Sequence, residues 1–220
     1  MDRVSSEPRT FGRLLIPSVV AGTILIVGCG LEDGSAEVGG VVYAPNGELA
    51  AASGPGLLAR LRAGLESEAR AMTGLERVAS GVEVRLERLD DEGSVEETLA
   101  TEETDSEGTY AIPLSSEDEH GSRLIVRVGS GDTRMRGFVS EENVDINPTS
   151  EVTVRLVLDS DYALANFAPG ELRTIADAVA AAADAVDAGD SIETAIDRAE
   201  DSARDDQTVT EAIRDAGASI

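Results

Sequence analysis

The alternation that decides the fold of this chain is Val82-Glu83-Val84-Arg85-Leu86-Glu87-Arg88-Leu89. Apolar and charged residues follow one another with a period close to two, so one face of the segment is aliphatic and the other is charged. This pattern is typical of a β-strand with one face against a core and the other in water. The acidic run that follows, residues 90–93, ends in glycine and indicates a turn into an antiparallel neighbour.

Similar short segments lie on both sides of this strand. Each is rich in Val, Leu, Ile or Thr and is bounded by glycine or acidic turns. They cover residues 37–43, 95–101, 110–114, 124–128, 133–139 and 152–158. Together with 82–89 they predict a mainly β fold, an antiparallel seven-stranded sandwich built on an aliphatic core.

Two regions follow a helical period instead. In residues 56–79 apolar side chains recur every three or four positions, which predicts an amphipathic helix inserted between the first two strands. This helix either docks on a sheet edge or receives a partner. Residues 160–220 predict a C-terminal helical appendage of three helices: one from Pro169 to Gly189, and two more that start with the capping-box spacings Asp190-Ser191-Ile192-Glu193 and Thr208-Val209-Thr210-Glu211.

Four short motifs carry a family resemblance. They are Val38-Gly39-Gly40-Val41-Val42, Pro45-Asn46-Gly47, Gly81-Val82-Glu83-Val84-Arg85-Leu86 and Thr104-Asp105-Ser106-Glu107-Gly108-Thr109-Tyr110. In this order they resemble the carboxypeptidase regulatory-like domain. The resemblance implies a transthyretin/Ig-like sandwich over residues 37–159, an accessory role in exported proteins and no catalytic residues. The chain departs from the family in one respect, since residues 48–80 separate the first two strands, where the family has only a few residues.

The N-terminus has the parts of an export signal. Three arginines precede an apolar run over residues 14–28, and the chain beyond Cys29 is acidic. The run is short and is broken by Pro17, Ser18 and Thr23, so a permanent membrane span is the weakest interpretation. An ordinary secretory signal, with Cys29 incidental, is a second interpretation.

The third interpretation is lipidation at Cys29, the only cysteine of the chain. The sequence Ile26-Val27-Gly28-Cys29 resembles the lipobox of prokaryotic lipoproteins. The resemblance implies a signal peptide over residues 1–28, cleavage between Gly28 and Cys29, and a diacylglyceryl group on the Cys29 sulfur. Residues 29–36 are then a lipidated, glycine-rich tether.

Charge restricts the partners. The chain has 43 acidic and 18 basic residues, a net charge of −25, and every basic residue is Arg. Such a surface repels nucleic acid and anionic lipid, so we expect no nucleic-acid partner and a membrane attachment only through the lipid on Cys29. Both a GC-rich codon bias and adaptation to high salt are consistent with this composition.

Few residues offer chemistry. His120 is the only histidine and lies in an acidic segment where an exposed loop side chain is expected, and Cys29 is used by the anchor. We therefore expect no catalytic residue and no cofactor, because zinc ligation and a thiolate nucleophile both lack the residues they need. Weak Ca²⁺ candidates are the acidic side chains of two turns, if these turns meet at one end of the sandwich: Asp90, Asp91, Asp105 and Glu107.

These observations predict a lipid-anchored, non-enzymatic protein of the cell envelope. We expect it on the periplasmic face of the outer membrane or on the cell surface, as a scaffold, adhesion or accessory module for other envelope proteins. The alternative is a ligand-binding lipoprotein that holds Ca²⁺ or a glycan in acidic loops at the sandwich end. A low aromatic content, 3% of residues, argues against a glycan.

Overall fold

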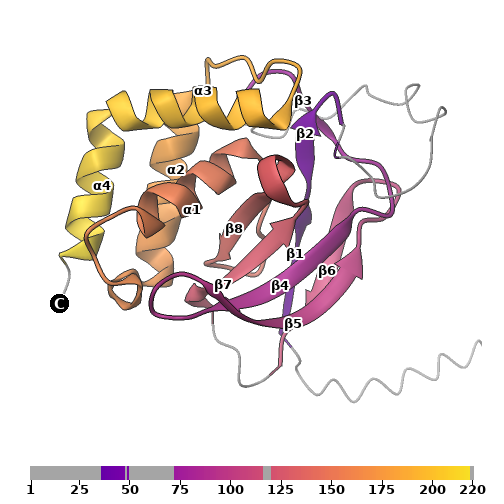
Figure 1. Ribbon diagram of the computed structural model, residues 1–220, viewed down its shortest axis with the longest axis horizontal. Helices are drawn as coiled ribbons and strands as arrows, with labels where there is room; N and C mark the ends of the chain where they lie inside the picture. Colours follow the sequence, from indigo (N-terminus) through magenta and orange to yellow (C-terminus); the bar gives the residue numbers. More distant parts are fainter. Residues whose placement is uncertain (1–35, 48, 50–71, 116–119, 219–220) are drawn as a thin grey trace, which may run out of the picture. The chain divides into compact units, whose positions relative to one another are not determined.

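The computed structural model describes residues 36–47, 49, 72–115 and 120–218 (Figure 1). Its strands are β1 (Glu37–Val41), β2 (Tyr43–Pro45), β3 (Leu75–Arg77), β4 (Glu83–Leu89), β5 (Val95–Glu103), β6 (Thr109–Pro113), β7 (Gly121–Val128) and β8 (Met135–Val139). Its helices are α1 (Pro148–Leu158), α2 (Pro169–Ala183), α3 (Ile192–Asp205) and α4 (Gln207–Gly217), with short 3₁₀ turns η2 (Gly131–Thr133) and η3 (Leu164–Asn166).

The largest sheet is antiparallel and has the strand order β5-β4-β7-β8. The alternation of β4 is realised as the sequence predicts at its start, where Val84 and Leu86 are buried and Arg85 is partly exposed. The register between β4 and β5 shifts after Leu86 and again after Arg88, so the strict period of two is lost there. β5 forms one edge of the sheet and is exposed along most of its length.

A second layer is organised around β1 and β2, which follow one another with only Val42 between them. One edge of this stretch pairs antiparallel with β6 and then with β3. The other edge bonds to residues 142–146, which run parallel to it, through bridges at Gly39 and Val42. Gly40 is required here, because a Cβ atom at this position would overlap the carbonyl group of Val144.

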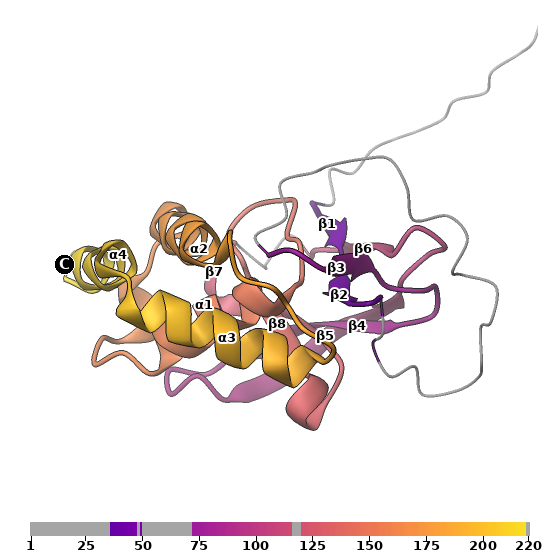
Figure 2. The same cartoon turned by 90° about the horizontal axis from the view of Figure 1, so that it is seen from above.

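The helices lie together beside β7 and β8 (Figure 2). α1 packs on β8 and contacts α2 and α3, while α2 also packs on α4. Buried side chains of strands and helices form one continuous apolar cluster, which includes Ile125 of β7, Phe167 after η3 and Ile196 of α3. The core is largely aliphatic, as the composition predicts.

The predicted strand over residues 152–158 is wrong, because these residues form the greater part of α1. β-branched residues suggested a strand, but the preceding Asn147-Pro148 pair starts a helix. The Asn147 side chain accepts hydrogen bonds from the backbone N–H groups of Thr149 and Ser150, and Ser150 bonds back to Asn147. α1 is buried on nearly all sides, so it lacks the single apolar stripe that reveals a helix in sequence.

Other boundaries also differ from the sequence prediction. Residues 56–71 of the predicted inserted helix lie outside the described residues, and within its last part Leu75–Arg77 form strand β3. α2 ends at Ala183, and Val186 and Ala188 bond to Thr73 in extended conformation. α3 has Ser191 as its N-cap, one residue after the predicted Asp190, and α4 is capped by Asp206 instead of Thr208.

The fold is therefore mixed, with antiparallel strands in sheets and four α-helices within the described residues, and the expectation of a mainly β protein is wrong in this respect. Among those residues, no helix combines the length and apolar character that a membrane crossing requires.

Candidate functional site

Three arginines lie opposite one another across the large sheet. The register pairs Arg127 of β7 with Arg85 of β4 on one side and with Arg136 of β8 on the other. Directly opposed residues project from the same face of a sheet, and like charges in such positions destabilise it. The exposed fraction of these side chains falls from 39% for Arg85 to 19% for Arg127 and 11% for Arg136. The row thus runs from solvent to the interior.

Glu87 balances the positive charge of Arg127, the middle arginine of the row. Its carboxylate accepts hydrogen bonds from Nε of Arg127 at 2.9 Å and from Nη2 at 2.6 Å, and its side chain is only 2% exposed. Nη1 of Arg127 also donates to the carbonyl oxygen of Gly129. A planar guanidinium facing a carboxylate in this way makes one of the stronger charge-assisted contacts in proteins.

Glu151 of α1 compensates the buried end of the row. Its side chain is fully buried, and Arg136 donates to both of its oxygens, at 2.9 Å from Nε and 2.8 Å from Nη2. Nε of Arg155, one turn further along α1, donates to the same carboxylate at 3.1 Å. Glu151 therefore ties α1 to β8 by charge as well as by packing.

The network continues to the helices. Arg155 donates to Glu200 of α3 at 3.0 Å, and Arg204 bonds both Glu200 and Asp159. Burial alone would raise the pKa of Glu200, but hydrogen bonds from Arg204 and Arg155 outweigh it and lower that pKa. Arg204 and Asp159 also line a hollow of about 280 Å³ between α1, α3 and α4.

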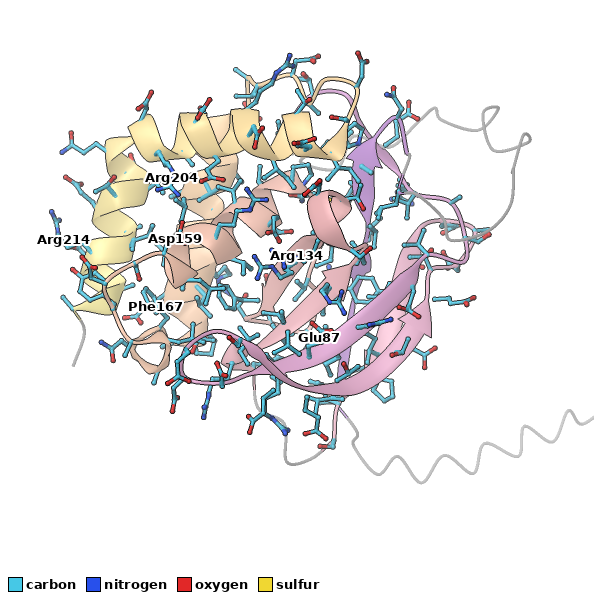
Figure 3. The ribbon with its side chains drawn as sticks, viewed as in Figure 1. Glu87, Arg134, Asp159, Phe167, Arg204 and Arg214 are labelled. Carbon is cyan, nitrogen blue, oxygen red and sulfur yellow. The ribbon has the colours of Figure 1, made fainter. Side chains whose placement is uncertain are left out.

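A further arginine, Arg134, lies near this network and has no carboxylate partner within hydrogen-bond range among the described residues. It follows η2 and is seen between α1 and Glu87 in Figure 3. Its Nε atom is buried and has no hydrogen-bond partner in the described part of the chain. Its nearest ion-pair contact, from Nη2 to Oε1 of Glu151, is 3.8 Å long, although 41% of its side chain is exposed.

We call Arg85, Arg127, Arg134, Arg136 and Arg155, with the carboxylates that pair with them, the arginine cluster. The paired carboxylates are those of Glu83, Glu87, Glu151 and Glu200. The paired members of the cluster join β4 to β7, α1 to β8 and α1 to α3, while the Nε atom of Arg134 has no hydrogen-bond partner within the described residues. The alternation of β4 predicts that Arg85 and Glu87 share a polar face, but nothing local in sequence reveals their partners on β7, β8 and α1.

The structure does not bring the weak Ca²⁺ candidates together. Asp90 and Asp91 lie in the turn before β5, and Asp105 and Glu107 lie in the turn after it. Nine residues of strand, about 30 Å, separate the two turns. Asp90 and Asp105 each accept hydrogen bonds from backbone N–H groups of their own turn, and Asp91 pairs with Arg123.

The remaining sequence candidates are placed as follows. Gly28 and Cys29 lie outside the described residues. His120 is partly buried, not an exposed loop side chain, and its Nε2 atom has no hydrogen-bond partner within the described residues. Across those residues, no group of three or more His, Cys, Asp or Glu side chains is arranged to hold a metal ion.

Tyr110, the last residue of the Thr104–Tyr110 motif, enters the core as its position predicts. Its hydroxyl donates to the carbonyl oxygen of Val144, and burial, followed by the charge of Asp145, raises its pKa. This residue joins the two edges of the second layer.

Comparison with known proteins gives no relative: no protein-family model, no curated protein and no solved structure matches the chain.

Proposed function

We propose that this chain is a lipid-anchored, non-enzymatic protein of the cell envelope whose folded domain serves as a scaffold, adhesion or accessory module. The observation that carries the proposal is the order of its parts. An Arg-bearing apolar run leads to Ile26-Val27-Gly28-Cys29, a short polar stretch follows, and the first strand begins at Glu37. A membrane-attached cysteine is thereby separated from the folded domain by only a few residues.

The chemistry of the domain supports a role in binding over one in catalysis. Its most buried carboxylates, Glu87 and Glu151, are held by arginines. Groups fixed in this way stabilise a domain and position its surfaces, whereas an acid or base needs a free proton site. The acidic-loop alternative, Ca²⁺ or glycan binding, lacks support from the geometry because the two turns lie at opposite ends of β5.

The strand half of the domain supports a finer proposal, a relationship to the carboxypeptidase regulatory-like sandwich. In favour are the antiparallel pairing of the strands within the sheets and the Asp105–Gly108 turn, in which the Asp105 side chain accepts hydrogen bonds from the N–H groups of Glu107 and Thr109. In this proposal residues 142–146 take the place expected for the last strand. An experimental structure with a different strand order in the second layer would overturn it.

Anchoring is tested by Cys29→Ala in the full-length chain, expressed in a bacterium with a lipoprotein pathway. We expect the wild-type chain to incorporate a labelled fatty acid and to stay with the membrane after a high-salt wash. The variant is expected to lose the label. Ser18→Ala, inside the apolar run, is the matched control and is expected to behave as wild type. Acyl label on Cys29→Ala, or none on the wild type, would contradict the proposal.

The role as a module is tested by crosslinking in intact cells, with the wild type compared with Cys29→Ala. We expect specific envelope proteins to be recovered with the wild type and to be depleted with the unanchored variant. If the same background proteins are recovered with both, the scaffold role is wrong even where the anchor is correct.

A further inference from the structure

The arginine cluster holds more positive than negative charge around Arg134. Four guanidinium groups, those of Arg127, Arg134, Arg136 and Arg155, lie near two buried carboxylates, Glu87 and Glu151. Glu200 balances Arg155 only in part, because it also pairs with Arg204. The imbalance falls on Arg134, since the other three guanidinium groups each donate to a carboxylate.

Glu151 cannot serve as the missing partner. Its Oε1 already accepts hydrogen bonds from Arg136 and Arg155, and its Oε2 accepts one from Arg136. The distance of 3.8 Å from Arg134 to Oε1 is outside hydrogen-bond range. Within the described residues, no carboxylate therefore lies within hydrogen-bond range of the Arg134 guanidinium.

The surroundings of Arg134 are unfavourable for a bare cation. Burial lowers its pKa, and the neighbouring charges of Arg136, Arg155 and Arg127 lower it further, against the opposing effect of Glu151. A buried donor without a partner also costs free energy that a ligand can recover. An anion beside this guanidinium would offset the unfavourable interaction with the neighbouring positive charges.

The site is also open to solvent. Of the Arg134 side chain 41% is exposed, although its Nε atom is buried, so a ligand from solvent would meet the other atoms of the side chain. Its backbone is fixed by the turn of η2, where its N–H group donates to the carbonyl oxygen of Gly131. A side chain that is exposed at one end and fixed at its base is suited to binding a small group from outside.

We propose that Arg134, supported by Arg127, Arg136 and Arg155, forms a binding site for a single oxyanion, either a carboxylate carried by an organic ligand or peptide or a free phosphate. A planar guanidinium binds both groups through two parallel hydrogen bonds, so the chemistry is shared. The inference goes beyond the proposed function, because it concerns the folded domain and holds whether or not Cys29 is lipidated.

The test is an NMR titration of the full chain in a maltoside detergent, which contributes no oxyanion of its own. The arginine Nε–H signals are followed as acetate or inorganic phosphate is added, with chloride at the same ionic strength as reference. We expect the Arg134 signal to move saturably with at least one oxyanion and not with chloride. The relative affinity of acetate and phosphate identifies the source.

Two variants make the test specific. Arg134→Gln is expected to weaken binding by about tenfold or more, read from the neighbouring arginine signals. Arg173→Gln is the matched control: Arg173 is also exposed and loosely paired, at 3.9 Å from Glu141, but lies on α2 away from the cluster. It is expected to bind as wild type, and circular dichroism checks the fold of both.

Three results would overturn the proposal. They are an Arg134 signal that does not move with either oxyanion, an equal movement in chloride, and equal binding by a folded Arg134→Gln variant. None of these outcomes bears on lipidation, which is read from the acyl label alone.

Discussion

Carboxylates have different partners in two regions of this domain. On the arginine cluster, Glu87 and Glu151 are buried and bind side chains from other elements, over separations of 40 and 15 residues. In the turns that flank β5, Asp90 is partly exposed, Asp105 is exposed, and both bind backbone groups no more than four residues away. In the first region Glu87 joins β4 to β7 and Glu151 joins α1 to β8, whereas the carboxylates of the second region fix only the direction of the chain.

The two regions show that the stabilising effect of a carboxylate depends on its burial and on its partners. A buried carboxylate is stable only with its cations, and those cations must come from several elements at once. An exposed turn carboxylate stays in water and gains a little from nearby N–H groups. Removal of the negative charge should therefore lower the free energy of unfolding strongly in the first region and only slightly in the second.

Glu151→Gln should have the largest effect. The change keeps the shape but leaves Arg136 and Arg155 without their shared counter-charge in the interior. We expect the free energy of unfolding to fall by about 3–5 kcal/mol, as for other broken buried pairs. Urea denaturation measures this, with Glu141→Gln as the exposed control. A loss below about 1 kcal/mol would show that the pair contributes little.

Glu87→Gln should have an intermediate effect of about 1–3 kcal/mol. Arg127 loses its carboxylate but is partly exposed and keeps its bond to the Gly129 carbonyl oxygen. The same urea titration applies. If Glu87→Gln lowers the free energy of unfolding as much as Glu151→Gln does, the burial of the paired arginine does not determine the contribution of the pair.

The pH dependence separates the regions further. A hydrogen bond from the Thr109 hydroxyl, with others from backbone N–H groups, lowers the pKa of Asp105 below its usual 3.8 in the folded chain. The stability it contributes is therefore present above the unfolded pKa and is lost as pH falls through the folded value. Asp105→Asn keeps an acceptor without titrating.

We expect the acid-unfolding midpoint of Asp105→Asn, followed by circular dichroism from pH 5 to 2, to differ from the wild type by roughly a few tenths of a pH unit, and the stability of the variant to vary less steeply with pH. Asp161→Asn is the exposed control. An unchanged slope for Asp105→Asn would mean that the turn bonds do not respond to ionisation.

Glu97→Gln should have the smallest effect. Glu97 pairs with Arg88 at 3.0 Å on the exposed strand β5, and its side chain is 57% exposed. Surface pairs of this kind contribute about 0–1 kcal/mol, less at high salt. A larger loss in urea denaturation would place this edge of the sheet in the same class as the buried cluster.

The same contrast explains what sequence could predict. The Asp105–Gly108 turn and the alternation at the start of β4 depend on residues within a few positions, and the structure confirms them. α1 was mistaken for a strand because Val152–Val157 favour both states, and tertiary burial together with the Asn147 cap decides between them.

The arginine cluster could not be predicted from the sequence, because its contacts join residues on different elements. The alternation of β4 predicts its polar face. The partner of Arg136, Glu151, lies on α1, which the sequence pattern predicts wrongly as a strand. No sequence pattern distinguishes Arg134 from the other arginines, because its lack of a hydrogen-bonded carboxylate within the described residues depends on the three-dimensional positions of Glu87 and Glu151. The Ca²⁺ candidates failed to meet because a single long strand, β5, lies between their turns.

The stretch formed by β1 and β2 has a mechanical consequence. It is the first part of the folded domain, and hydrogen bonds hold it along both edges, to β6 and β3 on one side and to residues 142–146 on the other. If the chain is tethered at Cys29, tension from the membrane enters the domain along this strand. Two rows of bonds then share the load, so the domain should yield to a pull on its leading end less readily than a domain that begins with an edge strand.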